Sequence, residues 1–196
     1  MISAAASAPA SASSLDLDAI SAVFTACFAD HADPLSRARL VRGGDEPLYR
    51  PATRARPWAE IIYARGLAAS SLHEAAHWLR AGPERRLLSD YGYWYEPDGR
   101  DDVAQALFEQ SEIEIQAIEW ILAQAAGVRF HISADNLRSP EPSDTFRAAI
   151  AVAIERRLAQ PLRGRFRLLA TALATASGRT LPTALAHQPL FASAGV

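Results

Sequence analysis

The sequence HEAAH at residues 73–77 constrains this chain more than any other feature, because its chemistry requires a helix. Residues four apart share one face of an α-helix, so the imidazoles of His73 and His77 reach one metal ion together. Glu74 lies about 100° around the helix from His73, where a carboxylate handles a proton on a metal-bound ligand. We therefore predict a helix over residues 67–80 that carries a metal site.

The metal site needs a third protein ligand, since a catalytic metal usually takes three and leaves one position open. A long helix is predicted over residues 101–126, and one of its faces carries several polar side chains. They are Glu109, Glu112, Gln116 and Glu119. We predict Glu112 as the third ligand and Glu109 as the runner-up, with Gln116 supporting a ligand by a hydrogen bond.

Other interpretations of these residues stay open. A solvated face is the usual fate of polar residues at helical spacing. His131 competes as the third ligand, although it sits in a predicted strand over residues 128–133, where a lone His is more often packed.

The ligand set leaves the class of protein open as well. Two histidines and one carboxylate suit zinc in a peptidase, with Glu74 as the general base, and equally Fe(II) in an oxygenase. A fourth protein ligand would instead close the site and make a non-catalytic, metal-stabilised binding module.

Composition and charge narrow the class of protein. The 196 residues are 49% hydrophobic and 21% charged, which supports one globular domain. A net charge of -2 argues against DNA and against a membrane surface as partners, and no stretch approaches the roughly 18 apolar residues of a membrane span. The single cysteine, Cys27, excludes an internal disulfide framework and fits a reducing compartment, so we expect a cytoplasmic protein.

Hydrophobic spacing indicates an α+β domain with helices around a small sheet. Residues 39–52 favour a strand, a turn and a strand, and residues 60–65 favour a further strand. More helices are expected from Leu17 to Phe28, capped by Ser14 or Asp16, and over residues 143–160 and 162–177. We divide the chain into a disordered Ala/Ser-rich tail (1–14), one domain (15–181) and a C-terminal tail (182–196).

Three stretches carry the most specific pattern in the chain: SLHEAAHWLRAG (71–82), YGYWYEPDGRD (91–101) and FEQSEIEIQA (108–117). Together they resemble the elongation factor P hydroxylase family. The stretches GDEPLYRPA and AAGVRFHISADNL support the resemblance, which runs in the same order from about Leu17 to about Leu181.

The resemblance implies a non-haem, metal-dependent hydroxylase with a zincin-like fold, whose metal lies between the HExxH helix and a following long helix. It implies elongation factor P as the partner and its β-lysylated lysine as the substrate. His73 and His77 match the family's ligands, Glu74 belongs to the motif, and Glu112 fits best as the ligand from the long helix. We expect one divalent metal, preferably Fe(II), with zinc as the alternative in the isolated protein, and molecular oxygen as co-substrate. We do not expect 2-oxoglutarate, since no basic residue can be placed beside the metal.

A cationic lysine-derived side chain needs aromatic and acidic neighbours, and YGYWYEPDGRD concentrates both. We expect it to lie against Tyr93, Trp94 or Tyr95, with Asp98 or Asp101 pairing its ammonium group. Asp45 is a second acidic candidate. The same residues also fit an aromatic strand packed on the core and a polar turn after it.

Overall fold

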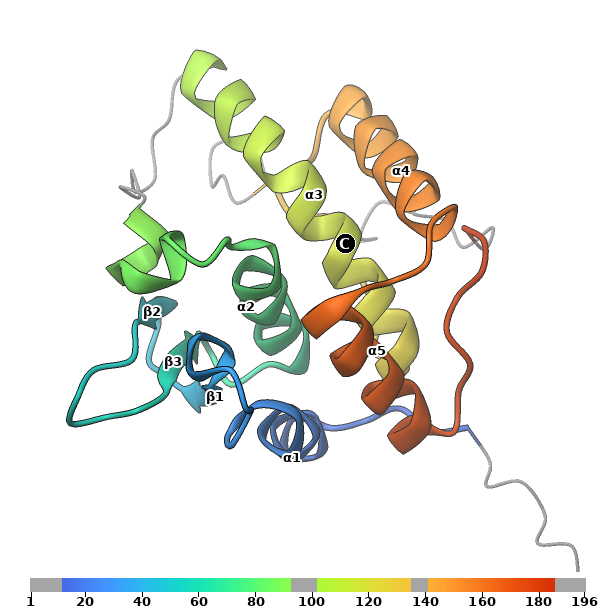
Figure 1. Cartoon of the computed structure of the whole chain (residues 1–196). Coiled ribbons are helices and arrows are strands. Elements are labelled where there is room, and N and C mark those ends of the chain that lie inside the picture. The colour runs from blue at the N-terminus through green and yellow to red at the C-terminus, as the bar shows by residue number, and fades with distance from the viewer. Residues whose placement is uncertain (1–11, 93–101, 135–140, 186–196) are drawn as a thin grey trace, which may run out of the picture.

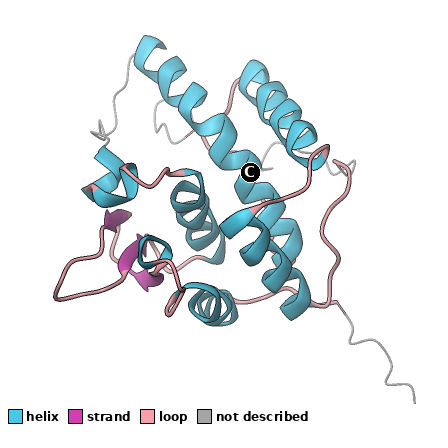
Figure 2. Cartoon of the chain, in the orientation of Figure 1, coloured by secondary structure: helices cyan, strands magenta, loops and turns pink. Residues whose placement is uncertain are grey.

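The computed structural model describes residues 12–92, 102–134 and 141–185 and confirms an α+β architecture (Figures 1 and 2). Among these residues there are five α-helices and one three-stranded sheet. In chain order they are α1 (Leu17–Phe28), β1 (Ala38–Arg42), β2 (Leu48–Arg50), β3 (Ala59–Tyr63), α2 (Ala68–Arg80), α3 (Asp102–Ala126), α4 (Asp144–Leu158) and α5 (Gly164–Ser177). Short 3-10 turns occur at η1 (Pro34–Ser36), η2 (Arg85–Leu87) and η3 (Ser89–Gly92).

The sheet has the order β1–β3–β2, so the two strands predicted within residues 39–52 form but do not pair with each other. Instead β3 lies between them, parallel to β1 and antiparallel to β2. In β3 the consecutive residues Ile61, Ile62 and Tyr63 are all buried. A strand with such a continuous apolar run is most stable at the centre of a sheet, where both of its edges are paired.

The long helix α3 is the central element of the fold, because α2, α4 and α5 all pack against it (Figure 1). It follows the predicted helix over residues 101–126 almost to the residue. Gly127 ends it with a φ of 73°, and a Cβ atom at this position would lie 2.9 Å from the Ser13 carbonyl oxygen. Both the positive φ and the close approach require glycine there.

An aromatic cluster packs the buried side of α2 against α1. Trp78 is fully buried, and its ring meets those of Phe28 and Phe24 edge-on at centroid distances of 4.8 and 5.5 Å. Both phenylalanines come from α1, whose first turn is capped by the Asp16 carboxylate accepting the Ala19 N–H. Burial of this cluster leaves another face of α2 directed at α3.

The strand predicted over residues 128–133 is not formed, and these residues follow an irregular path beside α3. The side-chain amide of Gln116 takes the place of a partner strand. It accepts the Ser133 N–H at 3.2 Å and donates to the Ser133 carbonyl oxygen at 2.7 Å. Backbone groups that have no neighbouring strand need such a substitute when they lie near the core.

The predicted domain limits stay a prediction, because residues 1–11 and 186–196 lie outside the described residues. None of the described helices has the length and apolar character needed to cross a membrane.

Candidate metal centre

The helix α2 presents two histidines on one face because its other faces are anchored. Leu72, Ala75 and Ala76 are buried in the core, so the helix has one favourable rotation about its axis. His73 and His77 then lie one turn apart beside this buried stripe, both partly exposed. Their rings meet edge to face with centroids 4.8 Å apart. The structure thus confirms that His73 and His77 share one face of a helix, as the HEAAH spacing predicts.

The C-terminal end of α2 is held by Arg165 from α5. Its guanidinium donates to the carbonyl oxygens of Trp78, Leu79 and Ala81 at 3.1 to 3.4 Å and lies 4.2 Å from the centre of the Trp78 ring. These carbonyls have no partner within the helix and form the negative end of its dipole. Burial, together with the charge of Arg86, lowers the pKa of Arg165 to about 10.

The facing helix α3 contributes three buried polar side chains in a row. Glu112, Gln116 and Glu119 are only 4%, 1% and 6% exposed. Their spacing places them on one face of α3, which packs against α2. The solvated-face alternative is therefore wrong for these residues. Buried carboxylates need partners, and α2 supplies the histidines.

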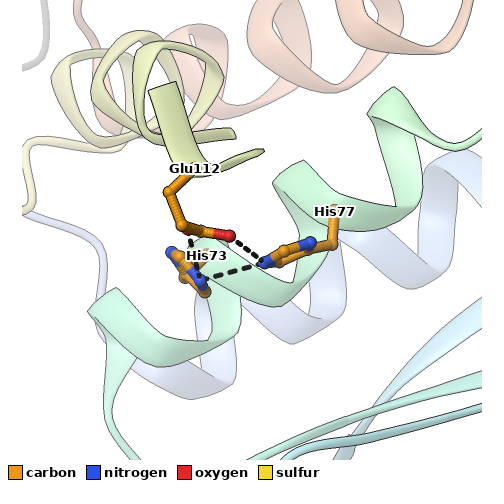
Figure 3. A group of neighbouring side chains, drawn as sticks. All are labelled: His73, His77 and Glu112. Atoms are coloured by element: carbon orange, nitrogen blue, oxygen red, sulfur yellow. Dashed lines mark hydrogen bonds and ion pairs between the residues drawn. The ribbon is translucent and has the colours of Figure 1, made fainter. Parts of the chain in front are cut away.

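Three nitrogen and oxygen atoms converge between α2 and α3 (Figure 3). His73 Nε2 and His77 Nε2 are 3.1 Å apart, and Glu112 oxygens lie 3.6 and 3.4 Å from them respectively. An ion about 2.0–2.2 Å from each of three ligands holds them roughly 3.0–3.5 Å apart. The three side chains therefore form a triangle of the right size and donor type for one divalent first-row metal ion.

Glu119 fixes the orientation of His73, and the sequence reasoning assigned it no role. Its Oε2 accepts a hydrogen bond from His73 Nδ1 at 2.7 Å, which leaves Nε2 directed at Glu112 and His77. A carboxylate on the outer nitrogen of a ligating histidine sets its tautomer and raises its basicity. The signal for this role was available, because Glu119 is a single acid within the apolar run AIEWILAQAA.

The charges around the two histidines give them opposite protonation states when no metal is bound. Burial acts to lower the pKa of His73, but the charge and hydrogen bond of Glu119, followed by the charges of Glu112 and Glu74, raise it to about 10. Burial and the positive charge of His73 hold the pKa of His77 well below its ordinary value. Without a metal, the neighbouring carboxylates therefore favour the protonated form of His73, and the charge of His73 favours the neutral form of His77.

Glu74 is the remaining member of the HEAAH motif and lies partly buried beside His73. Burial raises the pKa of Glu74 to about 7, and the charges of Glu112 and Glu119 add to this while the charge of His73 opposes it. A carboxyl group with such a pKa exchanges a proton near neutral pH. This arrangement suits a group that receives or returns a proton beside a metal ligand.

The other predicted site residues are distributed more widely. The Glu109 carboxylate accepts hydrogen bonds from Ser143 at 3.1 Å and from Gln105 at 3.4 Å and is not part of the converging group. Gln116 directs its amide at Ser133, so the predicted hydrogen bond to a ligating histidine comes from Glu119 instead.

The predicted site residues outside α3 do not join the converging group in the described part of the chain. His131 and Asp45 are both exposed, and neither is one of the three converging ligands. The substrate candidates Tyr93, Tyr95, Asp98 and Asp101 lie outside the described residues.

An aromatic residue that the sequence reasoning did not single out lies next to the histidines. The ring of Tyr91 is parallel to that of His77 to within 14°, at a centroid distance of 6.4 Å. Its other neighbour is Tyr49, which stacks on it at 4.1 Å. Burial raises the pKa of Tyr91 well above its ordinary value, and the nearby charge of Glu74 adds to this. The phenol therefore stays protonated at neutral pH.

Comparison with known proteins identifies the family of this chain. The model of a family described as elongation factor P hydroxylase matches residues 23–187. The elongation factor P lysine hydroxylase of Haemophilus influenzae is 54% identical over 129 residues, which cover 66% of this chain and 70% of that protein.

Proposed function

This chain belongs to the elongation factor P hydroxylase family, and on that premise we propose that it hydroxylates a lysine side chain of elongation factor P at the centre formed by His73, His77 and Glu112. The single observation that carries the proposal is the convergence of these ligand atoms from α2 and α3. Its size and donor set suit a metal-dependent hydroxylase, which is the class of the family.

We infer that the metal is a single non-haem Fe(II), with zinc as the alternative in the isolated protein. Bound there, Fe(II) would supply the activation of molecular oxygen for a monooxygenase-type insertion into a C–H bond. Glu119 holds His73 in the tautomer that directs Nε2 inward. Glu74 holds or moves a proton beside the ligands. We propose that the reaction has no requirement for 2-oxoglutarate, which the reconstitution described below tests directly.

The substrate follows from the same family relationship. We propose the β-lysylated lysine of elongation factor P, a long cationic side chain, as the group that is hydroxylated. The residues proposed to receive it are those that combine aromatic rings with acids: Tyr93, Tyr95, Asp98, Asp101 and Asp45. Aromatic faces attract an ammonium group and carboxylates pair with it.

The two alternatives from the sequence are not favoured. A zinc peptidase with Glu74 as general base shares the HExxH helix, but the family relationship is to hydroxylases. A non-catalytic module needs a closed site with four protein ligands, and the converging group among the described residues has three. The zincin-like relationship of the fold and the cytoplasmic location stay predictions.

Reconstitution with purified components tests the proposed function. The full chain is loaded with Fe(II) and incubated in air, with a reductant, with β-lysylated or unmodified elongation factor P. We expect the intact mass of the β-lysylated factor to rise by one oxygen atom, with and without added 2-oxoglutarate. The variant His77→Ala removes a ligand, and we expect it to leave the mass unchanged. Cleavage of the factor, or no mass change with any metal, would contradict the proposal.

A further inference from the structure

The hydroxyl of Tyr91 is a buried polar group whose partner is not found in the described part of the protein. The residue is 7% exposed, and no described group forms a hydrogen bond with its phenol oxygen. Most buried polar side-chain atoms have a partner, and those that lack one need an explanation. A phenylalanine would fill the same space without leaving a hydroxyl unpaired.

The backbone that carries Tyr91 is held in an unfavourable conformation. Asp90 has φ 46° and ψ 32°, and Tyr91 has φ 58° and ψ 18°, both in the left-handed region. Two successive non-glycine residues in this region are uncommon, and a bulky aromatic residue there is strained. Strain of this kind persists where the surrounding structure enforces it, and it concentrates at functional sites.

The surrounding structure does enforce it, through contacts on both residues. The Asp90 carboxylate accepts the N–H of Tyr49 in β2 at 2.8 Å, and Arg85 donates to the Tyr91 carbonyl oxygen at 3.0 Å. The Tyr91 ring is clamped by the ring of Tyr49, with 16° between their planes. These contacts place the phenol in one defined position without engaging its hydroxyl.

That position adjoins the proposed metal centre. The ring lies parallel to the ring of His77, which contributes one of the converging ligand atoms. Burial raises the pKa of Tyr91, and the charge of the nearby Glu74 carboxylate raises it further. The Tyr91 side chain therefore lies beside the HEAAH motif, next to His77.

We propose that the Tyr91 hydroxyl is a positioning group of the active site, which donates a hydrogen bond to the small oxygen-containing or anionic ligand at the open metal position. The inference rests on the proposed function, because it needs a metal at His73, His77 and Glu112. It explains why a buried hydroxyl has no partner among the described residues and why the turn that presents it is strained. The partner of the hydroxyl arrives with the ligand.

The variant Tyr91→Phe tests this inference in the full chain loaded with Co(II), which reports on its ligands through its visible spectrum. Azide serves as the probe for the open position. We expect Tyr91→Phe to bind Co(II) within about twofold of the wild-type affinity and to bind azide roughly tenfold more weakly, the worth of one hydrogen bond. Its thermal midpoint should equal or exceed that of the wild type, since the hydroxyl forms no hydrogen bond with the described residues.

Tyr49→Phe is the matched control, because the Tyr49 hydroxyl donates to the Arg86 carbonyl oxygen at 2.8 Å. We expect it to lower the thermal midpoint and to leave the azide affinity unchanged. In hydroxylation of elongation factor P, Tyr91→Phe should lower kcat with little change in KM.

The inference is overturned if azide does not bind the wild-type centre or binds Tyr91→Phe as tightly, or if Tyr91→Phe loses as much stability as Tyr49→Phe. If the wild-type chain fails to bind Co(II), the proposed metal centre is wrong, and both proposals fall together.

Discussion

Replacing Glu119 by Gln tests the electrostatics of the centre, because the two side chains have almost the same shape and differ in charge. Glu119 is the largest of the influences that raise the pKa of His73 to about 10. At pH 8, two units below this value, about 99% of His73 is an imidazolium. With an ordinary pKa of about 6.5, only about 3% would be protonated. The substitution should lower the pKa of His73 toward its ordinary value, so that most of the side chain is neutral at pH 8.

This change should be visible in metal binding, because a ligating histidine has to be neutral and the proton on His73 must leave. We expect the wild-type chain to release about one proton per Zn(II) at pH 8, and its apparent affinity to rise about tenfold per pH unit from pH 7 to pH 9. Glu119→Gln should release few protons, and its affinity should change little over this range. The less tightly oriented ring should lower its limiting affinity roughly 10- to 100-fold.

Calorimetric titration with Zn(II), in buffers that differ in ionisation enthalpy, counts the protons directly. Glu109→Gln is the matched control, because it removes a carboxylate from the same helix that pairs with Gln105 and Ser143 rather than with a histidine. It should release as many protons as the wild type. If Glu119→Gln releases them as well, the account of His73 is refuted.

Three further predictions concern ligation and stability. Glu112→Ala should abolish tight metal binding and Glu109→Ala should preserve it, as measured by equilibrium dialysis, and the reverse result would show that the third ligand is wrongly assigned. Because the folded-state pKa of His73 is raised, its ion pair stabilises the metal-free fold fully below about pH 6.5 and is lost as pH rises toward 10. Urea unfolding without metal should therefore show a free energy of unfolding that falls on the order of 1 kcal/mol per pH unit between pH 7 and 9, and a flat profile would contradict this. Gln116→Ala should lower the free energy of unfolding by about 1–3 kcal/mol, because the backbone groups of Ser133 lose two hydrogen bonds, and a change below about 0.5 kcal/mol would argue against that role.

The helical parts of the site could be predicted from sequence because their information is local. The spacing of His73 and His77 determines that they share a face of α2, and the apolar pattern of residues 101–126 indicates one long helix. Of the two acids that the sequence offers as the third ligand, Glu112 and Glu109, the structure places Glu112 in the converging group. What the sequence leaves open is how α2 and α3 cross.

The crossing of the two helices decides which polar residue meets which histidine. Gln116 and Glu119 share a face of α3, yet only Glu119 reaches His73, while Gln116 meets Ser133. The position of β3 between β1 and β2 depends in the same way on contacts distant in sequence. The left-handed backbone at Tyr91 could not be predicted, because YGYWY has strong strand propensity. At this position tertiary contacts override the local preference.

The central claim is that this chain adds oxygen to elongation factor P through the centre that contains Glu112. The most direct test is the intact mass of elongation factor P purified from host cells with the gene intact, with the gene deleted, and with the deletion complemented by wild type or by Glu112→Ala. The account predicts that the modified lysine loses the mass of one oxygen atom in the deletion, that the wild-type gene restores it and that Glu112→Ala does not. An unchanged mass in the deletion strain would contradict the account.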